Sequence, residues 1–359
     1  MAFTRQTRLT TTALAGLATL SLLTSATACS SDESPKNPKI ADAAPRLASV
    51  PPEVQPPPTS TPTPPVSGVE AKKITQDYFD LSRQAKSAHD LQALDKIESG
   101  PLLDISKARQ DRILKHGDNI PSSEERATND QIKVVTPEGS PIGTDRWILS
   151  IGRQSLSGKS RSSLGILRQS KGTGPWKMTF LSYSEVDQKI PEISKIATKD
   201  GTRNLAASNI DYGEDTCLAF GNFLNGNETI EWGPRAKSTR QIADNQIRDG
   251  RALTSGGSVS ARMEKARDGD SPAWITANGD KIVMCSMQTT SKLTAGPSGS
   301  FSINQSSGFQ NLNGRTTKWK TLDLTNSSMI VLKIPALKDQ PVDIIAESYR
   351  ALSTDGTSA

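Results

Sequence analysis

The sequence predicts a mixed α+β protein with two tandem domains, each built from helices packed on one face of an antiparallel meander sheet. Over residues 69–116 apolar side chains recur with the period of a helix, and over residues 146–180 they alternate as in strands. The same order, helices before strands, returns between residues 217 and 349. These observations place a first domain at residues 69–198 and a second domain at residues 199–355.

The first 28 residues are predicted to be a lipoprotein signal peptide. Two arginines precede an uncharged apolar run at residues 9–23, which is too short to span a bilayer as an ordinary helix. The tetrapeptide Ala-Thr-Ala-Cys at residues 26–29 resembles a bacterial lipobox. That resemblance implies that Cys29 becomes the first residue of the mature chain and carries the lipid. Ordinary secretory cleavage after Ala28 is the alternative.

Residues 29–68 are predicted to form a disordered, proline-rich tether. Eleven of the 22 prolines of the chain lie between Pro35 and Pro65, and proline at this density favours extended polyproline II over a packed core. A tether of this kind suits a protein whose N-terminus is held at a membrane. We therefore expect a lipid-anchored protein on the extracytoplasmic face of the cell membrane.

Three helices are predicted in the first domain. The apolar face of the first helix is formed by Ile74, Tyr78, Leu81 and Ala85. Asp90 is placed to cap the second helix, and Gly100-Pro101 is typical of its end. The third helix is expected over residues 102–114.

Three strands are predicted next, at residues 146–151, 163–167 and 176–180. Residues 146–177 contain seven basic side chains and no acidic one. The candidate anion-binding residues in this segment are Arg146, Arg153, Lys159, Arg161, Arg168, Lys171 and Lys177. Such a surface would attract an anionic envelope polymer or lipid headgroups. The alternative is that these residues keep the strand edges solvated. We expect no nucleic-acid partner, because no platform of aromatic residues accompanies the charge.

In the second domain, strands are predicted at residues 274–276, 281–287, 328–334 and 342–349. The connection at residues 294–314 has no periodicity and contains three apolar side chains of interest, Phe301, Ile303 and Phe309. A loop of this length either closes over a ligand, packs onto the core or is disordered.

Two cysteines remain once Cys29 carries the anchor, and we predict that they form a disulfide. Cys217 shares a helical face with Phe220, and Cys285 shares a strand face with Val283. A helix that packs on a sheet through those two faces brings the sulfur atoms together. The extracytoplasmic compartment is oxidising, which favours this bond over the alternative of two buried thiols.

The sequence contains no motif that specifies catalysis or metal binding. Residues 152–160 approximate a phosphate-binding loop, but five residues rather than four separate the first glycine from the Gly-Lys-Ser triplet. The two histidines, His89 and His116, are expected at helix ends, and they are too few for a multi-histidine metal site. We therefore expect no catalytic residues, no metal, no cofactor and no enzymatic activity.

Four short stretches resemble an uncharacterised group of actinobacterial lipoproteins that carry a domain of unknown function. These are residues 78–79, 90–94, 100–103 and 174–178. Each half of the chain is also similar in layout to the cone-shaped fold of nuclear-transport-factor-2-like and cystatin-like domains. The resemblance implies an architecture and a compartment, and it carries no catalytic residue.

The hypothesis that follows is a binding or scaffolding module of the cell envelope, with an anionic envelope polymer or an envelope protein as its partner. The alternative is a carrier that holds a small or polymeric ligand in a cone-shaped pocket. An enzyme is the third hypothesis.

Overall fold

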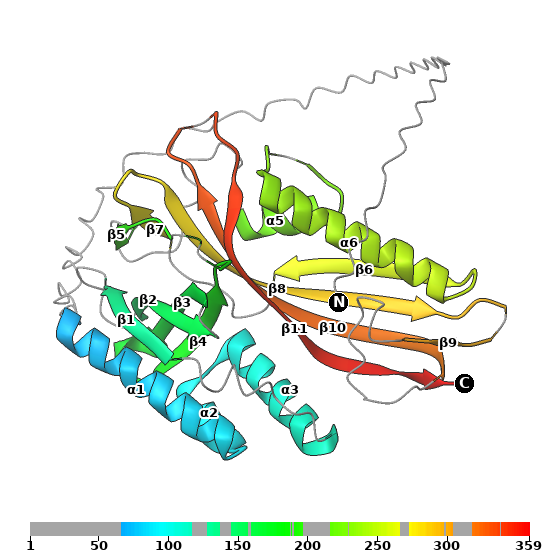
Figure 1. Cartoon of the computed structure of the whole chain (residues 1–359), viewed down its shortest axis with the longest axis horizontal. Helices are drawn as coiled ribbons and strands as arrows, with labels where there is room; N and C mark the ends of the chain where they lie inside the picture. The colour runs from blue at the N-terminus through cyan, green and yellow to red at the C-terminus, as the bar shows by residue number, and fades with distance from the viewer. Residues whose placement is uncertain are drawn as a thin grey trace, which may run out of the picture. The chain divides into compact units, whose positions relative to one another are not determined.

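The computed structural model (Figure 1) contains one compact unit at residues 57–359, to which all of the described residues belong. The described residues are 66–116, 128–136, 145–156, 159–186, 188, 190–196, 216–228, 230–265, 273–297, 299–303, 318–337 and 339–359. The predicted signal peptide, Cys29 and the predicted tether up to residue 65 lie outside them. Val66, near the end of that tether, is buried in the core, and its carbonyl oxygen accepts a hydrogen bond from the Thr136 hydroxyl (3.2 Å).

The first half begins with three helices. They are α1 (Gly68–Ser87), α2 (Leu91–Ile97) and α3 (Gly100–His116). The Ser67 hydroxyl caps α1 by accepting a hydrogen bond from the Glu70 N–H (3.1 Å). The Asp90 carboxylate caps α2 in the same way, by accepting from the Ala93 N–H (2.9 Å). Gly100 has a φ of 58°, which glycine adopts without strain, and this conformation turns the chain from α2 into α3. The three predicted helices and the Asp90 cap are confirmed, but Leu81 of the predicted apolar face of α1 is 47% exposed.

Four antiparallel strands in the order β1-β2-β3-β4 form the small sheet. Their bounds are β1 Thr128–Val135, β2 Arg146–Leu156, β3 Lys159–Gln169 and β4 Trp176–Tyr183. The 3-10 turn η1 (Ser170–Gly172) joins β3 to β4, and Lys171 in this turn has a φ of 54°. The predicted meander is confirmed, and β1 adds an edge strand that the periodicity did not predict.

The second half contains the large sheet, which has seven strands among the described residues. They are β5 Ile193–Ile196, β6 Ser258–Lys265, β7 Trp274–Thr276, β8 Lys281–Thr294, β9 Phe301–Ser302, β10 Lys318–Ile334 and β11 Asp343–Ser358. The main path is β11-β10-β8-β7-β5, with β6 paired to β8 and β9 to β10. β5 precedes the predicted domain boundary at residue 199, yet it pairs with β7.

Two helices accompany the large sheet, α5 (Thr216–Leu224) and α6 (Pro234–Leu253). α5 packs against β6, β8 and α6. A disulfide between Cys217 and Cys285 joins α5 to β8, with the two Cα atoms 5.4 Å apart. The predicted disulfide and the predicted docking of this helix on this strand are confirmed. Figure 1 shows α6 lying along the long strands of the sheet.

The main hydrophobic core is shared by the two sheets. Trp147 and Ile166 of the small sheet belong to the same buried cluster as Met284, Met329 and Ala346 of the large sheet. Burial of apolar surface between the sheets therefore contributes to holding the two halves in one compact unit. The α+β class is confirmed, with helices and an antiparallel sheet in each half.

Two smaller buried clusters lie within the second half. One is centred on the α5 residues Phe220 and Phe223 together with Trp232. The other contains Phe301 and Ile303, which are 4% and 3% exposed. These two side chains of the predicted loop therefore pack onto the core, whereas Phe309 lies outside the described residues.

Candidate functional site

β11 passes between two cavities. Successive side chains of a strand point to opposite faces of its sheet. Glu347 and Tyr349 accordingly line a cavity beneath α6, whereas Arg350 lines a second cavity beside α1 and α3, and Ser348 borders both. We call the first the α6 cavity and the second the basic cavity.

The α6 cavity has a volume of about 270 Å³. Its lining residues come from α6 and from β6, β8, β10 and β11: Thr239, Ile242, Ala243, Gln246, Ile247, Val259, Ala261, Met263, Thr289, Ser291, Ser328, Ile330, Glu347, Ser348 and Tyr349. α6 presents Ile242, Ala243 and Ile247 to the cavity, at the spacing of one helical face. Ala243 and Ala261 leave room between helix and sheet, because their side chains are too small to fill it.

A few polar groups are set into these apolar walls. The Thr289 hydroxyl oxygen is buried and has no hydrogen-bond partner within the described part of the chain. Burial raises the pKa of Tyr349 to about 12, so this phenol stays protonated at neutral pH. Apolar walls with a small number of polar groups are typical of small-molecule sites.

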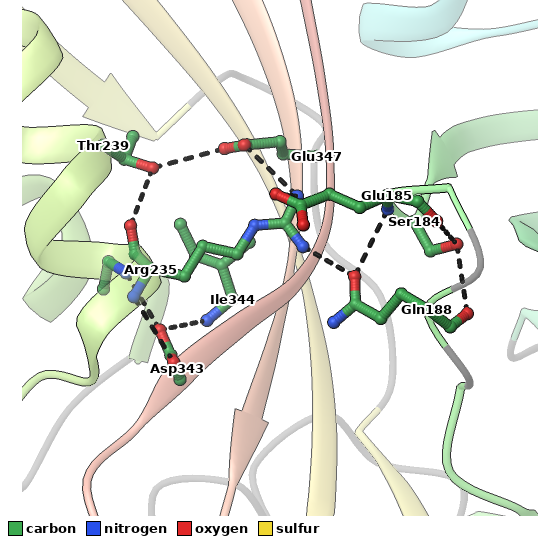
Figure 2. A network of polar contacts seen from close by, with 9 residues as sticks. Ser184, Glu185, Gln188, Arg235, Thr239, Asp343, Ile344 and Glu347 are labelled. Carbon is green, nitrogen blue, oxygen red and sulfur yellow. Dashed lines mark hydrogen bonds and ion pairs between the residues drawn. The ribbon is translucent and has the colours of Figure 1, made fainter. Parts of the chain in front are cut away.

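The N-terminal end of α6 carries a polar network in which Arg235 is central (Figure 2). The Arg235 side chain is 16% exposed, and its Nη2 atom lies 3.3 Å from a Glu347 oxygen and 3.5 Å from a Glu185 oxygen. Its Nη1–H donates to the Gln188 side-chain oxygen (2.7 Å). The guanidinium thus joins α6 to β11 and to the segment that follows β4. It also places a cation beside Glu347, the carboxylate that lines the α6 cavity.

Asp343 holds the first turn of α6 in place (Figure 2). Its Oδ1 atom accepts a hydrogen bond from the Ala236 N–H (2.9 Å), and its Oδ2 atom accepts a long one from the Arg235 N–H (3.5 Å). A carboxylate at a helix N-terminus also interacts favourably with the helix dipole. Gly233 is required next to it, because a Cβ atom there would meet the Asp343 Cγ atom at 2.3 Å.

The basic cavity has a volume of about 150 Å³ and lies among α1, α3, β2, β3, β4 and β11. Five cationic side chains line it, and no carboxylate does: Arg83, Lys86, Arg109, Arg161 and Arg350. The apolar part of the wall is formed by Tyr78, Phe79, Leu102, Ile105, Leu181 and Tyr183. A cation-lined cavity with an apolar floor differs in chemistry from the largely apolar α6 cavity.

Arg161 is held in the basic cavity by two neutral partners. Its Nε–H donates to the side-chain oxygen of Gln154 (2.7 Å), and its guanidinium carbon lies 4.1 Å from the centre of the Tyr183 ring. Stacking on an aromatic ring fixes the guanidinium plane and leaves its charge uncancelled. Among the described residues, no carboxylate pairs with Arg161.

Lys86, by contrast, pairs with a buried carboxylate behind the cavity wall. Glu98 is 0% exposed, and its Oε1 atom lies 3.1 Å from the Lys86 ammonium. The same oxygen accepts a hydrogen bond from the Tyr78 hydroxyl (2.9 Å) and lies 3.4 Å from the Ser82 hydroxyl. Burial, and secondly the charge of Glu98, raise the pKa of Tyr78 well above its usual value. Tyr78 is therefore a protonated donor to Glu98.

The structure separates the seven predicted anion-binding residues. Arg161 and Arg168 lie seven positions apart on β3 and so point to opposite faces of the small sheet. Arg168 lies 2.5 Å from an Asp145 oxygen, and its guanidinium is 5.4 Å from the centre of the Trp147 ring. Of the seven, Arg161 lines the basic cavity.

Four of the other five predicted residues lie outside the basic cavity. Arg146 stacks 5.7 Å from the centre of the Trp176 ring, and Arg153 is exposed and donates to the Ser160 hydroxyl. Lys171 sits in the turn before β4, and the Lys177 ammonium donates to the Asp95 carbonyl oxygen (2.5 Å). Lys159 begins β3, and its side chain lies outside what the structure describes. The six residues whose side chains are described do not converge on one site.

Four of the five cationic residues of the basic cavity were not predicted as site residues from the sequence. Arg83 and Lys86 lie three positions apart on one face of α1, which is the single local signal of the site. Arg109 and Arg350 come from α3 and from β11, the last strand, and tertiary packing alone brings them together. No residue of the α6 cavity was predicted as a site either.

Within the described ranges, no three histidine, cysteine or acidic side chains are grouped as a metal would require. Among these described residues, no helix is both long enough and apolar enough to cross a membrane. The family model of a domain of unknown function, DUF8094, matches residues 62–356, which is most of the chain. No curated protein and no solved structure matches the chain.

Proposed function

The chain belongs to the DUF8094 family, whose description assigns no activity, and we propose from its cavities that it is a lipid-anchored extracytoplasmic carrier for a small apolar ligand. The α6 cavity is the observation that carries this proposal. A cavity of about 150 Å³ lined by apolar side chains is known to hold benzene. The α6 cavity is larger, at about 270 Å³, and therefore has room for a fused-ring compound or a short acyl chain.

The anchoring part of the proposal rests on the N-terminal sequence. The apolar run, the lipobox-like residues 26–29 and the proline-rich segment follow one another in the order of an anchored lipoprotein. The disulfide between Cys217 and Cys285 supports an oxidising compartment, because such bonds are rare in the reducing cytosol. The resemblance to actinobacterial lipoproteins and to cone-shaped domains stays part of the same proposal.

Anchoring is tested by detergent phase separation of the full chain expressed in a bacterial host. The wild-type protein should enter the detergent phase, and the Cys29→Ser variant should accumulate as a precursor or leave the membrane fraction. If the wild-type protein stays in the aqueous phase, the anchor is disproved, because a lipid-modified N-terminus partitions with detergent.

Carrier function is tested with N-phenyl-1-naphthylamine, a neutral apolar dye that fluoresces in apolar surroundings. We expect saturable binding at one dye per molecule of the mature chain carrying Cys29→Ser. Ala261→Trp fills the α6 cavity and should weaken dye binding about 10-fold or more, because it removes the space for the dye. Ala252→Trp, at an exposed position on α6, is the matched control and should leave binding unchanged.

Two results would reject the carrier proposal. One is the absence of saturable dye binding to the mature chain that carries Cys29→Ser alone. The other is equal loss of binding in Ala261→Trp and Ala252→Trp. Either would favour the scaffolding hypothesis, in which the surface of the domain and not the α6 cavity makes the functional contact.

A further inference from the structure

We propose that the basic cavity is a second binding site, which takes a small ligand composed of an anionic group attached to an apolar ring. This inference goes beyond the carrier function, because it concerns the other face of β11. The anionic group would be a phosphate or a carboxylate, and the ring would be of the size of benzene.

Charge identifies the anionic part of the ligand. Five cationic side chains from four elements line a space of about 150 Å³ without a carboxylate among the lining residues. Outside the lining, Arg83 pairs with Asp80 (3.5 Å) and Lys86 with Glu98 (3.1 Å). The cationic side chains nevertheless line one space, and an anion bound there interacts favourably with all of them. Arg161 is oriented for this task, because only its Nε–H has a hydrogen-bond partner among the described residues. The four remaining N–H donors of a guanidinium suit a phosphate or a carboxylate.

The floor identifies the apolar part. Leu102, Ile105 and Leu181 contribute aliphatic surface, and the rings of Phe79 and Tyr183 lie in the same wall. A free inorganic ion would leave this surface in contact with water. A ring attached to the anion covers it, and a volume near 150 Å³ is sufficient for one benzene-sized ring.

Lys86 and Arg350 are two further cations of the site. Lys86 is held by Glu98 on the inner side, where Tyr78 also donates to the same oxygen. The Nη1–H of Arg350 donates to the carbonyl oxygen of Tyr349, the neighbouring residue that faces the α6 cavity. The two cavities therefore share a strand but use different side chains, which allows each to be altered without altering the other.

The experiment titrates phenyl phosphate into the mature chain carrying Cys29→Ser, by isothermal titration calorimetry. We expect binding at a ratio of one, weakened by added salt. Arg161→Gln removes the central guanidinium and should weaken binding about 10-fold or more, as expected for loss of a charge-assisted hydrogen bond. Arg153→Gln is the matched control, because Arg153 is exposed on the neighbouring strand and bonds to Ser160 outside the cavity. It should leave binding unchanged.

Two further probes separate the parts of the ligand. Benzyl alcohol has the ring without the charge, and inorganic phosphate has the charge without the ring. Both should bind at least about 10-fold more weakly than phenyl phosphate. Equal binding of inorganic phosphate would overturn the role of the apolar floor, and equal binding of benzyl alcohol would overturn the role of the cations.

Failure of this proposal is distinguishable from failure of the carrier function. Phenyl phosphate should not displace N-phenyl-1-naphthylamine from the α6 cavity. The Ala261→Trp variant should bind phenyl phosphate as tightly as the chain without that substitution does. Circular dichroism establishes that each variant folds, and Arg350→Gln on β11 repeats the test if Arg161→Gln does not fold. Absence of saturable phenyl phosphate binding, or equal loss in Arg153→Gln, would overturn the second site.

Discussion

The two cavities on either side of β11 have walls of opposite character. On the α6 side the wall is largely apolar, and Arg235 lies 3.3 Å from Glu347, the one carboxylate that lines it. On the other side the wall carries five cations, and Glu98, the carboxylate paired with Lys86, is fully buried behind the wall. A single strand can therefore border two sites of different chemistry, because its side chains alternate between faces.

The two sides of β11 also differ in the interactions that stabilise them. The α6 side is held by apolar packing, by the Asp343 contacts at the helix end and by the Cys217–Cys285 disulfide through α5. The basic side depends on a buried polar pair, Glu98 with Lys86, to which Tyr78 is hydrogen-bonded. Removing one support at a time should separate these contributions.

The largest effect is expected on the α6 side, from the disulfide. Replacing both cysteines, Cys217→Ala and Cys285→Ala, should lower the free energy of unfolding by about 4 kcal/mol, because the bond closes a loop of 68 residues in the unfolded chain. Urea unfolding followed by circular dichroism measures the difference. Reduction of the wild-type protein is the control and should give a similar loss, and a loss below about 1 kcal/mol from both would show that the bond stabilises little.

The next effect concerns the basic side. Glu98→Ala leaves Lys86, Tyr78 and Ser82 without their shared acceptor, and we expect a loss of about 3 kcal/mol in the free energy of unfolding. Asp77→Ala removes one partner of an exposed pair on the same helix, with Lys73, and should cost less than about 1 kcal/mol. Equal losses in the two variants would mean that burial of Glu98 adds nothing to the pair.

The sequence predicted local features of the fold well. Asp90 is a short-range signal and placed the start of α2 correctly, whereas Gly100-Pro101 begins α3 and α2 already ends at Ile97. The disulfide was also predictable, since a helical face and a strand face each carried one cysteine beside apolar residues. The long strands were underestimated. β8 was predicted to end at residue 287, but it continues to Thr294, and the added residues are polar apart from Leu293.

The candidate sites were harder to predict, for physical reasons. A cavity is a place where packing is incomplete, and no local pattern reports what lies opposite a given side chain. Arg161 was predicted within a basic segment, yet Arg168, seven positions further along β3, points to the opposite face of the sheet. Arg109 and Arg350, which line the same cavity as Arg161, are distant from it in the sequence and come close to it only in the folded chain.

The smallest effect expected is a difference in alkaline stability between the two sides. Burial raises the pKa of Tyr349 to about 12, from an ordinary value of 10.0. The neutral phenol is favoured in the folded state, so its contribution is fully present below about pH 10. It is lost between about pH 10 and 12, because the unfolded chain releases the proton in that interval while the folded chain retains it. Tyr349→Phe should therefore lose less stability than the wild type across this interval.

On the basic side, Tyr78 also has a raised pKa, and its cause differs from that of Tyr349. Its pKa is raised by burial and, in addition, by the charge of Glu98, whereas burial is the cause for Tyr349. Glu98→Gln should lower the pKa of Tyr78 and leave that of Tyr349 unchanged, because the added cause acts on one side of β11 only. The measurement is a spectrophotometric titration of tyrosinate in Glu98→Gln and in its Tyr78→Phe and Tyr349→Phe derivatives. A shift of both phenols by the same amount would contradict the electrostatic separation of the two cavities.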